Sequence, residues 1–250
     1  MSGPQLSSDA ALARRPLLVA VDGPSGSGKS SVSREVARRL GVAYLDTGAM
    51  YRAVTWSALE AGLDLADTAA VAAHARALDL RMTTDPQAPG VAVGGVDVAA
   101  AIRETRISSV VSAVAVNLEV RAELHRRQRE LIGAALAGPR GGMVAEGRDL
   151  TTVVAPHADV RLLLTASEQA RVARRARELH GHAGAEALAA TVDQVVRRDA
   201  VDSTVARFLT AEDGVTHLDS SDLDFEQTVA AVLDLVARAS GPAPLLDPAR

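Results

Sequence analysis

Short apolar runs alternate with longer amphipathic stretches along most of the chain. The first run, Leu17–Val21, is apolar throughout and has the length of a buried strand. The following segment, 29–40, repeats its apolar residues with helical spacing, and Gly41 ends the predicted helix. A second short strand is expected at 42–45. This order of strand, helix and strand is typical of an α/β fold with a parallel sheet.

The same alternation returns in the second half of the chain. Further helices are expected at about 49–61, 105–136, 167–180, 186–200 and 225–239, and further strands at 143–145, 160–164 and 215–219. Strands that alternate with helices indicate a parallel sheet covered by helices on both faces.

A different pattern interrupts the alternation between residues 64 and 110. Residues 65–78 are rich in Ala and predict a helix, whereas residues 78–82 alternate with period two. Two further short strands flank Gly94-Gly95, a pair that favours a two-residue hairpin turn. We interpret 64–110 as a small α+β insertion that projects from the main domain.

The domain organisation follows from these patterns. The ends of the chain are expected to be flexible tails, the second of them rich in Pro. The predicted parts are the tail 1–15, a core of 16–63 and 111–240, the insertion 64–110 and the tail 241–250.

The composition argues against several classes of function. The chain has 250 residues, 48% of them hydrophobic, which suits one α/β domain with a small insertion. Two Tyr, two Phe and one Trp offer no stacking surface for single-stranded nucleic acid, and a net charge of −4 argues against a general polyanion binder. There is no Cys, and no apolar run approaches membrane-spanning length. We expect a cytoplasmic monomer that acts on small molecules, without a nucleic-acid or membrane partner.

The turn after the first strand carries the clearest chemistry. Residues 23–30 fit G-x-x-x-x-G-K-[ST], a loop whose glycines let backbone N–H groups surround an anion. Lys29 would reach the outer phosphates, and the Ser30 hydroxyl can ligate Mg²⁺. The helix that follows also favours phosphate through its dipole. The residues expected to bind a nucleoside triphosphate are Gly23, Pro24, Ser25, Gly26, Ser27, Gly28, Lys29, Ser30 and Ser31.

A second polar motif, Asp46–Arg52, follows the second strand and falls at the edge where α/β sheets bind ligands. Its carboxylate, hydroxyl and guanidinium suit a second ligand with polar groups and a phosphate. The alternative is a plain helix start, with Asp46 or Thr47 as cap and Arg52 in solvent.

Taken together, these motifs resemble the bacterial cytidylate (CMP/dCMP) kinases of the nucleoside monophosphate kinase family. The resemblance rests on the heptad D-[ST]-G-A-x-Y-R behind the loop G-P-S-G-x-G-K, and it covers about residues 17 to 239. Further matching segments are 101–103, Ser112, 121–124, 126–129, 146–149 and 197–204. The resemblance implies a P-loop NTPase-type sheet with a monophosphate-binding insertion and a short lid around 168–186. It also implies phosphoryl transfer from ATP, with Mg²⁺, to CMP or dCMP.

The same resemblance assigns the acceptor site. It places Thr47 and Arg52 near the CMP phosphate and Arg148 near the transferring group. Ser112, Arg121 and Asp149 would contact the cytosine, and Arg198 and Asp202 the acceptor phosphate and sugar. A carboxylate suits the N4 amine of cytosine and would be left unpaired by the carbonyl of uracil.

Simpler structural roles exist for several of these residues. Arg121 could belong to a solvated helix face, and Asp149 could cap a helix or pair with Arg148. Arg198 and Asp202 lie four residues apart, so a helix would bring them together as a plain ion pair.

The metal site and the lid involve further polar residues. Ser30 and Glu146, which ends an apolar strand, are the candidates for Mg²⁺, and Asp22 and Asp46 compete with them. For Asp22, hydrogen bonding to loop amides is the alternative.

The lid candidates are basic. Arg171, Arg174 and Arg175 match the R-x-x-R-R lid of related kinases, which folds over the ATP phosphates, so the resemblance implies that Arg174 binds ATP. An exposed basic helix would show the same pattern. The six histidines, expected at the surface or in loops, are His74, His125, His157, His180, His182 and His217.

One position departs from the family. Members usually continue D-S-x-R, but this chain has Val205 after Thr204. Arg207 is the candidate replacement, and it is expected to join Lys29, Arg52 and Arg148 in catalysis. Without a replacement, a diverged nucleotide-binding or regulatory protein becomes the rival function. Another small-molecule kinase with the same loop is the runner-up among enzymes.

Overall fold

The computed structural model of the protein describes residues 15–180, 184, 191–192 and 198–240. The two expected tails lie almost entirely outside these residues. So do the end of the expected lid and most of the helix expected at 186–200.

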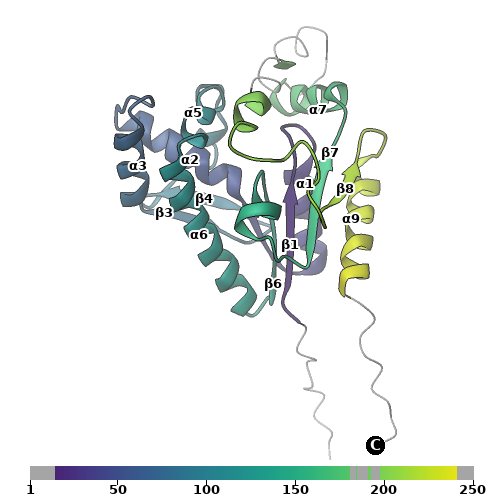
Figure 1. Ribbon diagram of the computed structural model, residues 1–250. Helices are drawn as coiled ribbons and strands as arrows, with labels where there is room; N and C mark the ends of the chain where they lie inside the picture. The colour runs from purple at the N-terminus through teal and green to yellow at the C-terminus, as the bar shows by residue number, and fades with distance from the viewer. Residues whose placement is uncertain (1–14, 181–183, 185–190, 193–197, 241–250) are drawn as a thin grey trace, which may run out of the picture.

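The core is a sheet of five parallel strands in the order β2-β6-β1-β7-β8 (Figure 1). The strands are β1 (Leu17–Asp22), β2 (Ala43–Asp46), β6 (Gly142–Gly147), β7 (Val160–Thr165) and β8 (Thr216–Asp219). This confirms the α/β fold with a helix-covered parallel sheet. The phosphate loop follows the central strand, β1, so the loop lies at the carboxyl edge of the sheet, where such folds bind ligands.

A hydrophobic core lies on each face of the main sheet, and alternate residues of a strand contribute to one core or the other. In β1, Leu18 and Ala20 pack with α2 (Thr47–Glu60) and α6 (Leu118–Ala137). Val19 and Val21 point to the opposite face and pack with α1 (Lys29–Leu40) and α9 (Phe225–Ser240). Figure 1 shows α6 on one side of the sheet and α9 on the other. Because side chains alternate along a strand, an apolar run such as β1 must be buried on both faces.

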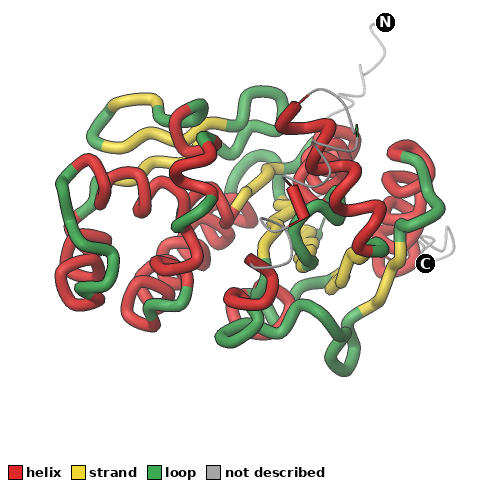
Figure 2. The backbone as a smooth tube through the Cα atoms, turned by 90° about the horizontal axis from the view of Figure 1, so that it is seen from above, coloured by secondary structure: helices red, strands yellow, loops and turns green. Residues whose placement is uncertain are grey.

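A second sheet of three antiparallel strands forms the predicted insertion. It consists of β3 (Leu80–Thr83), β4 (Gly90–Val93) and β5 (Val96–Asp97). Gly94 and Gly95 have φ of 56° and 82°, so they form the tight hairpin that this pair predicts. The small sheet packs against α2, on the opposite side of the molecule from α9 (Figure 2). The boundaries of the insertion stay a prediction.

The remaining helices differ in detail from the sequence expectation. The helix expected at 65–78 is α3 (Thr68–Ala77), capped by the Asp67 side chain. The helical stretch expected at 105–136 is divided into α4 (Thr105–Ser108), α5 (Val111–Ala115) and α6, and Asn117 caps the last of these. Further elements are the 3₁₀ helix η1 (Ala101–Arg103), the π-helical turn η2 (Leu150–Val154) and α7 (Glu168–His180). Among the described residues, no helix is both long and apolar enough to cross a bilayer.

Candidate active site

A cleft of about 680 Å³ lies at the carboxyl edge of the main sheet and reaches the small sheet. Most of the predicted site residues line it, although they come from five separate parts of the chain. These lining residues are Ser25, Gly26, Gly28, Lys29, Ser30, Ser31, Thr47, Arg52, Arg121, Glu146, Arg148, Asp149, Arg198 and Asp202. The fold therefore gathers donor and acceptor candidates in a single cleft.

The phosphate loop has the backbone that its glycines predict. Gly26 and Gly28 have φ of 75° and 89°, in the left-handed region that only glycine adopts readily. A Cβ on Gly26 would lie 2.5 Å from the carbonyl oxygen of Arg171 in α7. Lys29 begins α1 directly after this turn, and its Nζ donates to the carbonyl of Pro24 at 3.3 Å. Burial in the cleft lowers the pKa of Lys29, and the nearby charge of Glu146 opposes this shift.

Beside the loop, oxygen atoms gather in a way that suits a divalent cation. The Ser30 hydroxyl donates to the Glu146 carboxylate, Oγ to Oε1, at 2.6 Å. Burial and the negative charge of Asp46 raise the pKa of Glu146 to about 7. A hydroxyl and two close carboxylates are ligands of the kind that Mg²⁺ prefers, and a cation would relieve their repulsion. The residues present therefore fit a magnesium ion.

Asp22 takes no part in this oxygen cluster. Its carboxylate accepts hydrogen bonds from the amides of Leu150 and Thr151 at 3.1 and 2.8 Å, and from the Thr151 hydroxyl at 2.7 Å. Burial raises its pKa to about 6, and it does not line the cleft. The geometry favours a structural role in binding backbone amides, although these amides belong to the turn that follows Asp149 and not to the phosphate loop.

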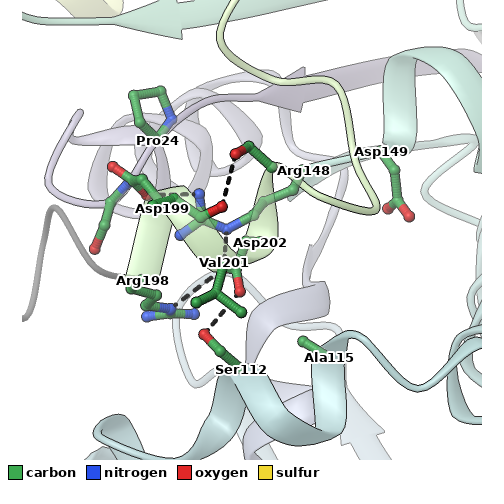
Figure 3. A network of polar contacts seen from close by, with 12 residues as sticks. Pro24, Ser112, Ala115, Arg148, Asp149, Arg198, Asp199, Val201 and Asp202 are labelled. Atoms are coloured by element: carbon green, nitrogen blue, oxygen red, sulfur yellow. Dashed lines mark hydrogen bonds and ion pairs between the residues drawn. The ribbon is translucent and has the colours of Figure 1, made fainter.

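Arg148 is held between two carboxylates (Figure 3). Its Nη1 lies 2.9 Å from Oδ1 of Asp199, and its Nε lies 2.9 Å from Oδ2 of Asp202. The guanidinium also stacks over the buried ring of Phe208, 4.3 Å from its centroid. Ser112 does not line the cleft, but its hydroxyl donates to Asp202 at 2.8 Å. Arg148 is thus fixed in direction and cannot swing freely.

Asp199 connects this cluster to the phosphate loop. Its Oδ1 accepts the backbone N–H of Ser25 at 3.0 Å, and its Oδ2 pairs with Arg171. Arg171 also donates to the carbonyl of Ser25 at 3.0 Å. Sequence reasoning did not single out Asp199, although it lies beside Arg198 in a segment that matched the family.

Arg52 and Arg198 make the acceptor side strongly positive. Arg52 donates to the Ser108 hydroxyl at 2.7 Å, and Arg198 lies 3.5 Å from Asp202. The pKa of Arg52 is lowered by burial and then by Arg198, and that of Arg198 by burial and then by Arg148. Crowded guanidinium groups remain charged at neutral pH, so they favour an anionic ligand such as a phosphate. The alternative from sequence is right about the helix start, because the Asp46 carboxylate accepts the amide of Ala49 at 2.9 Å and caps α2. It is wrong about Arg52, which is not in solvent.

A third cluster surrounds Asp149 at the start of the turn after β6. Arg121 pairs with its Oδ2, and His125 Nε2 lies 2.7 Å from the same oxygen. Burial would raise the pKa of Asp149, but the hydrogen bond from His125 and the charges of His125 and Arg121 outweigh burial and lower it. Arg121 and Asp149 are 9% and 4% exposed, so a solvated helix face does not describe Arg121. The surface position expected for His125 is also wrong.

The sequence model of the cytidylate kinase family matches residues 19–238. The chain belongs to the cytidylate kinase family. It is 45% identical over 222 residues to a cytidylate kinase from Streptomyces avermitilis, with 88% of this chain and 92% of that protein covered. It is 46% identical to one from Cutibacterium acnes, with 88% and 96% covered. Membership of this family makes the chain a phosphotransferase that binds a nucleotide.

Arg174 and Arg207, like Arg171, lie outside the cleft of this cytidylate kinase family member. Arg174 donates to the carbonyl of Ser27 at 3.1 Å and of Ser220 at 2.7 Å, so it braces the phosphate loop from α7. Contacts of this kind do not fit the alternative of an exposed basic helix.

Arg207 points into solvent. Its side chain is 79% exposed and pairs with Glu212 at 3.1 Å. The neighbours on either side, Ala206 and Phe208, are buried, so the side chain between them points outward. The geometry therefore gives no support to Arg207 as the replacement at Val205, and its catalytic role stays a prediction.

Proposed function

We propose that this protein transfers the γ-phosphoryl group of ATP, with Mg²⁺, to CMP and dCMP and forms CDP and dCDP. The observation that carries the proposal is that one cleft is lined by the phosphate loop and by the Arg121–Asp149 pair. Arg148 links the two parts, because it precedes Asp149 in the chain and shares Asp199 with the loop residue Ser25.

The donor triphosphate would lie along the phosphate loop. Loop amides and Lys29 would hold its β- and γ-phosphates, and Ser30 and Glu146 would hold Mg²⁺. When bound, Mg²⁺ neutralises charge on the transferring phosphates. Arg174 would keep the loop in its shape from behind.

The acceptor would occupy the positive end of the cleft. Arg52 and Arg198 would bind its phosphate, and Asp202 its sugar. The Thr47 hydroxyl donates to the carbonyl of Glu146 at 2.8 Å, so it would bind the phosphate only after it turns away from that carbonyl. The residues that determine which base is accepted would be Arg121 and Asp149. Ser112, which donates to Asp202, would assist them from outside the cleft lining. Arg148 would stabilise the charge on the group in transit. Catalysis then comes from holding two nucleotides in line and from fixed positive charge, since this reaction needs little covalent chemistry from the protein.

The rival functions lack support of this kind. A regulatory homologue without turnover has no need for an Arg148 that two carboxylates hold beside the phosphate loop. The absence of a nucleic-acid partner, the monomeric state and the cytoplasmic location stay predictions.

The test is diphosphate formation from ATP and Mg²⁺ with CMP, dCMP, UMP, AMP and GMP offered separately. We expect turnover with CMP and dCMP, and much slower turnover with the other three. A Lys29→Ala variant purified in parallel controls for contaminating kinases. Binding of CMP without turnover would contradict the proposal and favour the regulatory function.

A further inference from the structure

His125 lies directly behind the residue that would distinguish bases. Its Nε2 is 2.7 Å from Oδ2 of Asp149, and its side chain is buried. Asp149 and Arg121 line the cleft, whereas His125 is not part of the lining. His125 can therefore act on a bound nucleotide only through Asp149.

Helix geometry explains why two donors meet one oxygen. Arg121 and His125 are four residues apart on α6, so their side chains share a face of the helix. Both approach Oδ2 of Asp149, and neither uses Oδ1. Two donors fix both the position and the rotation of the carboxylate, and they leave Oδ1 for a ligand.

The turn below Asp149 is fixed as well. Asp22 holds the backbone amides of Leu150 and Thr151, the two residues that follow Asp149. The main chain that follows Asp149 and the Asp149 side chain are thus anchored from different elements, β1 and α6. A carboxylate held in this way can read a small difference between two ligands, because it cannot rotate to fit the wrong one.

We propose that His125 is a positioning residue that sets the selectivity of this kinase for cytosine over uracil. The inference rests on the proposed function, since it needs CMP as the acceptor. His125 donates from Nε2 to Oδ2, which turns Oδ1 toward the N4 amine of cytosine. The carboxylate stays ionised and accepts from that amine, whereas the O4 carbonyl of uracil offers it no proton.

A purely structural role predicts something else. A buried histidine that only fills space would, when replaced, lower stability and reduce activity with every acceptor alike. A positioning role affects CMP more than UMP, because only CMP makes the bond that His125 orients. The two roles therefore differ in the ratio of kcat/KM for CMP to kcat/KM for UMP.

The experiment compares His125→Leu, His125→Gln and His74→Leu. Leu removes the donor, whereas the Gln amide nitrogen has about the same reach as Nε2. His74 is the matched control, since it also bonds a side chain, the Ser57 hydroxyl at 2.8 Å, but does not contact Asp149. We expect His125→Leu to lower the CMP/UMP ratio about 10-fold, mainly through KM for CMP, which is the size of one hydrogen bond to a charged group. His125→Gln should recover most of the ratio, and His74→Leu should leave it unchanged.

An unchanged ratio in a folded His125→Leu enzyme would overturn the inference, as would equal losses with CMP and UMP. If no acceptor is phosphorylated by the unaltered protein, the proposed function fails instead. Should His125→Leu not fold, ¹⁵N spectra of the histidine rings in the unaltered protein decide the matter. They should show a proton on Nε2 of His125 whose signal changes in Asp149→Asn and on addition of CMP. A His125 ring without a proton on Nε2 would refute the proposed hydrogen bond to Asp149.

Discussion

Replacing Asp149 by Asn should strongly weaken the preference for cytosine over uracil. Asn has the same shape as Asp, but it has one acceptor oxygen and one amide donor. Arg121 and His125 both present donors to the inner oxygen of residue 149. The Asn oxygen must turn toward them, so its NH₂ group must face the base.

The magnitude follows from these partners. For CMP, the variant loses a hydrogen bond to a charged acceptor, which is worth about 1.5 kcal/mol or more. The N4 amine of cytosine then faces another donor in a buried site, which costs about 1–3 kcal/mol. For UMP, the Asn amide can donate to O4, so binding improves. Because a tenfold change corresponds to about 1.4 kcal/mol, the CMP/UMP ratio of kcat/KM should fall by about 100-fold or more.

The assay is steady-state diphosphate formation with CMP and with UMP, for the unaltered enzyme, Asp149→Asn and Asp79→Asn. Asp79 is the matched control, since it is half-exposed and pairs with Arg81 on the small sheet, away from the cleft. Circular dichroism and thermal melting check that each variant is folded. A folded Asp149→Asn enzyme with the CMP/UMP ratio of the unaltered protein would refute the assignment of Asp149 to the base.

Three further outcomes are expected. Lys29→Ala should reduce turnover by at least ~100-fold, because it removes fixed charge from the transferring phosphates, while calorimetry still detects CMP binding; an active variant would contradict the role. At low Mg²⁺, activity should fall as the pH drops below about 7, since protons compete with the metal for Glu146, whose raised pKa keeps it protonated there. High Mg²⁺ should shift this loss of activity to lower pH. A pH dependence that does not change with Mg²⁺ would exclude Glu146 as a metal ligand. Arg207→Ala should keep kcat within ~3-fold, because an exposed ion pair contributes little; a 100-fold loss would mean that Arg207 enters the cleft during turnover.

Much of the fold could be predicted from local pattern. The apolar runs at β1 and β7 and the amphipathic stretch of α1 have lengths and spacings that admit one interpretation. The hairpin at Gly94-Gly95 followed from the conformations that only glycine adopts readily. The apolar spacing did not show the break between α5 and α6. The local signal for it was Asn117, whose side chain caps α6 and also donates to the carbonyl of Thr68.

The site was predicted in part, for a physical reason. Motifs showed that Lys29, Arg121 and Asp149 belong to nucleotide chemistry, and the cleft gathers them. The partners of those residues are set by the three-dimensional arrangement, so neither Asp199 nor His125 could be assigned from spacing alone. For His125 one signal was available: its distance of four residues from Arg121 on a predicted helix.

Asp199 also ties together parts of the chain that are far apart in sequence. Its carboxylate binds the Ser25 amide in the phosphate loop, Arg148 after β6 and Arg171 in α7. Because these three groups meet on one side chain, a neutral residue at position 199 would release all of them together. The shape of the phosphate loop and the direction of Arg148 therefore depend on the same carboxylate.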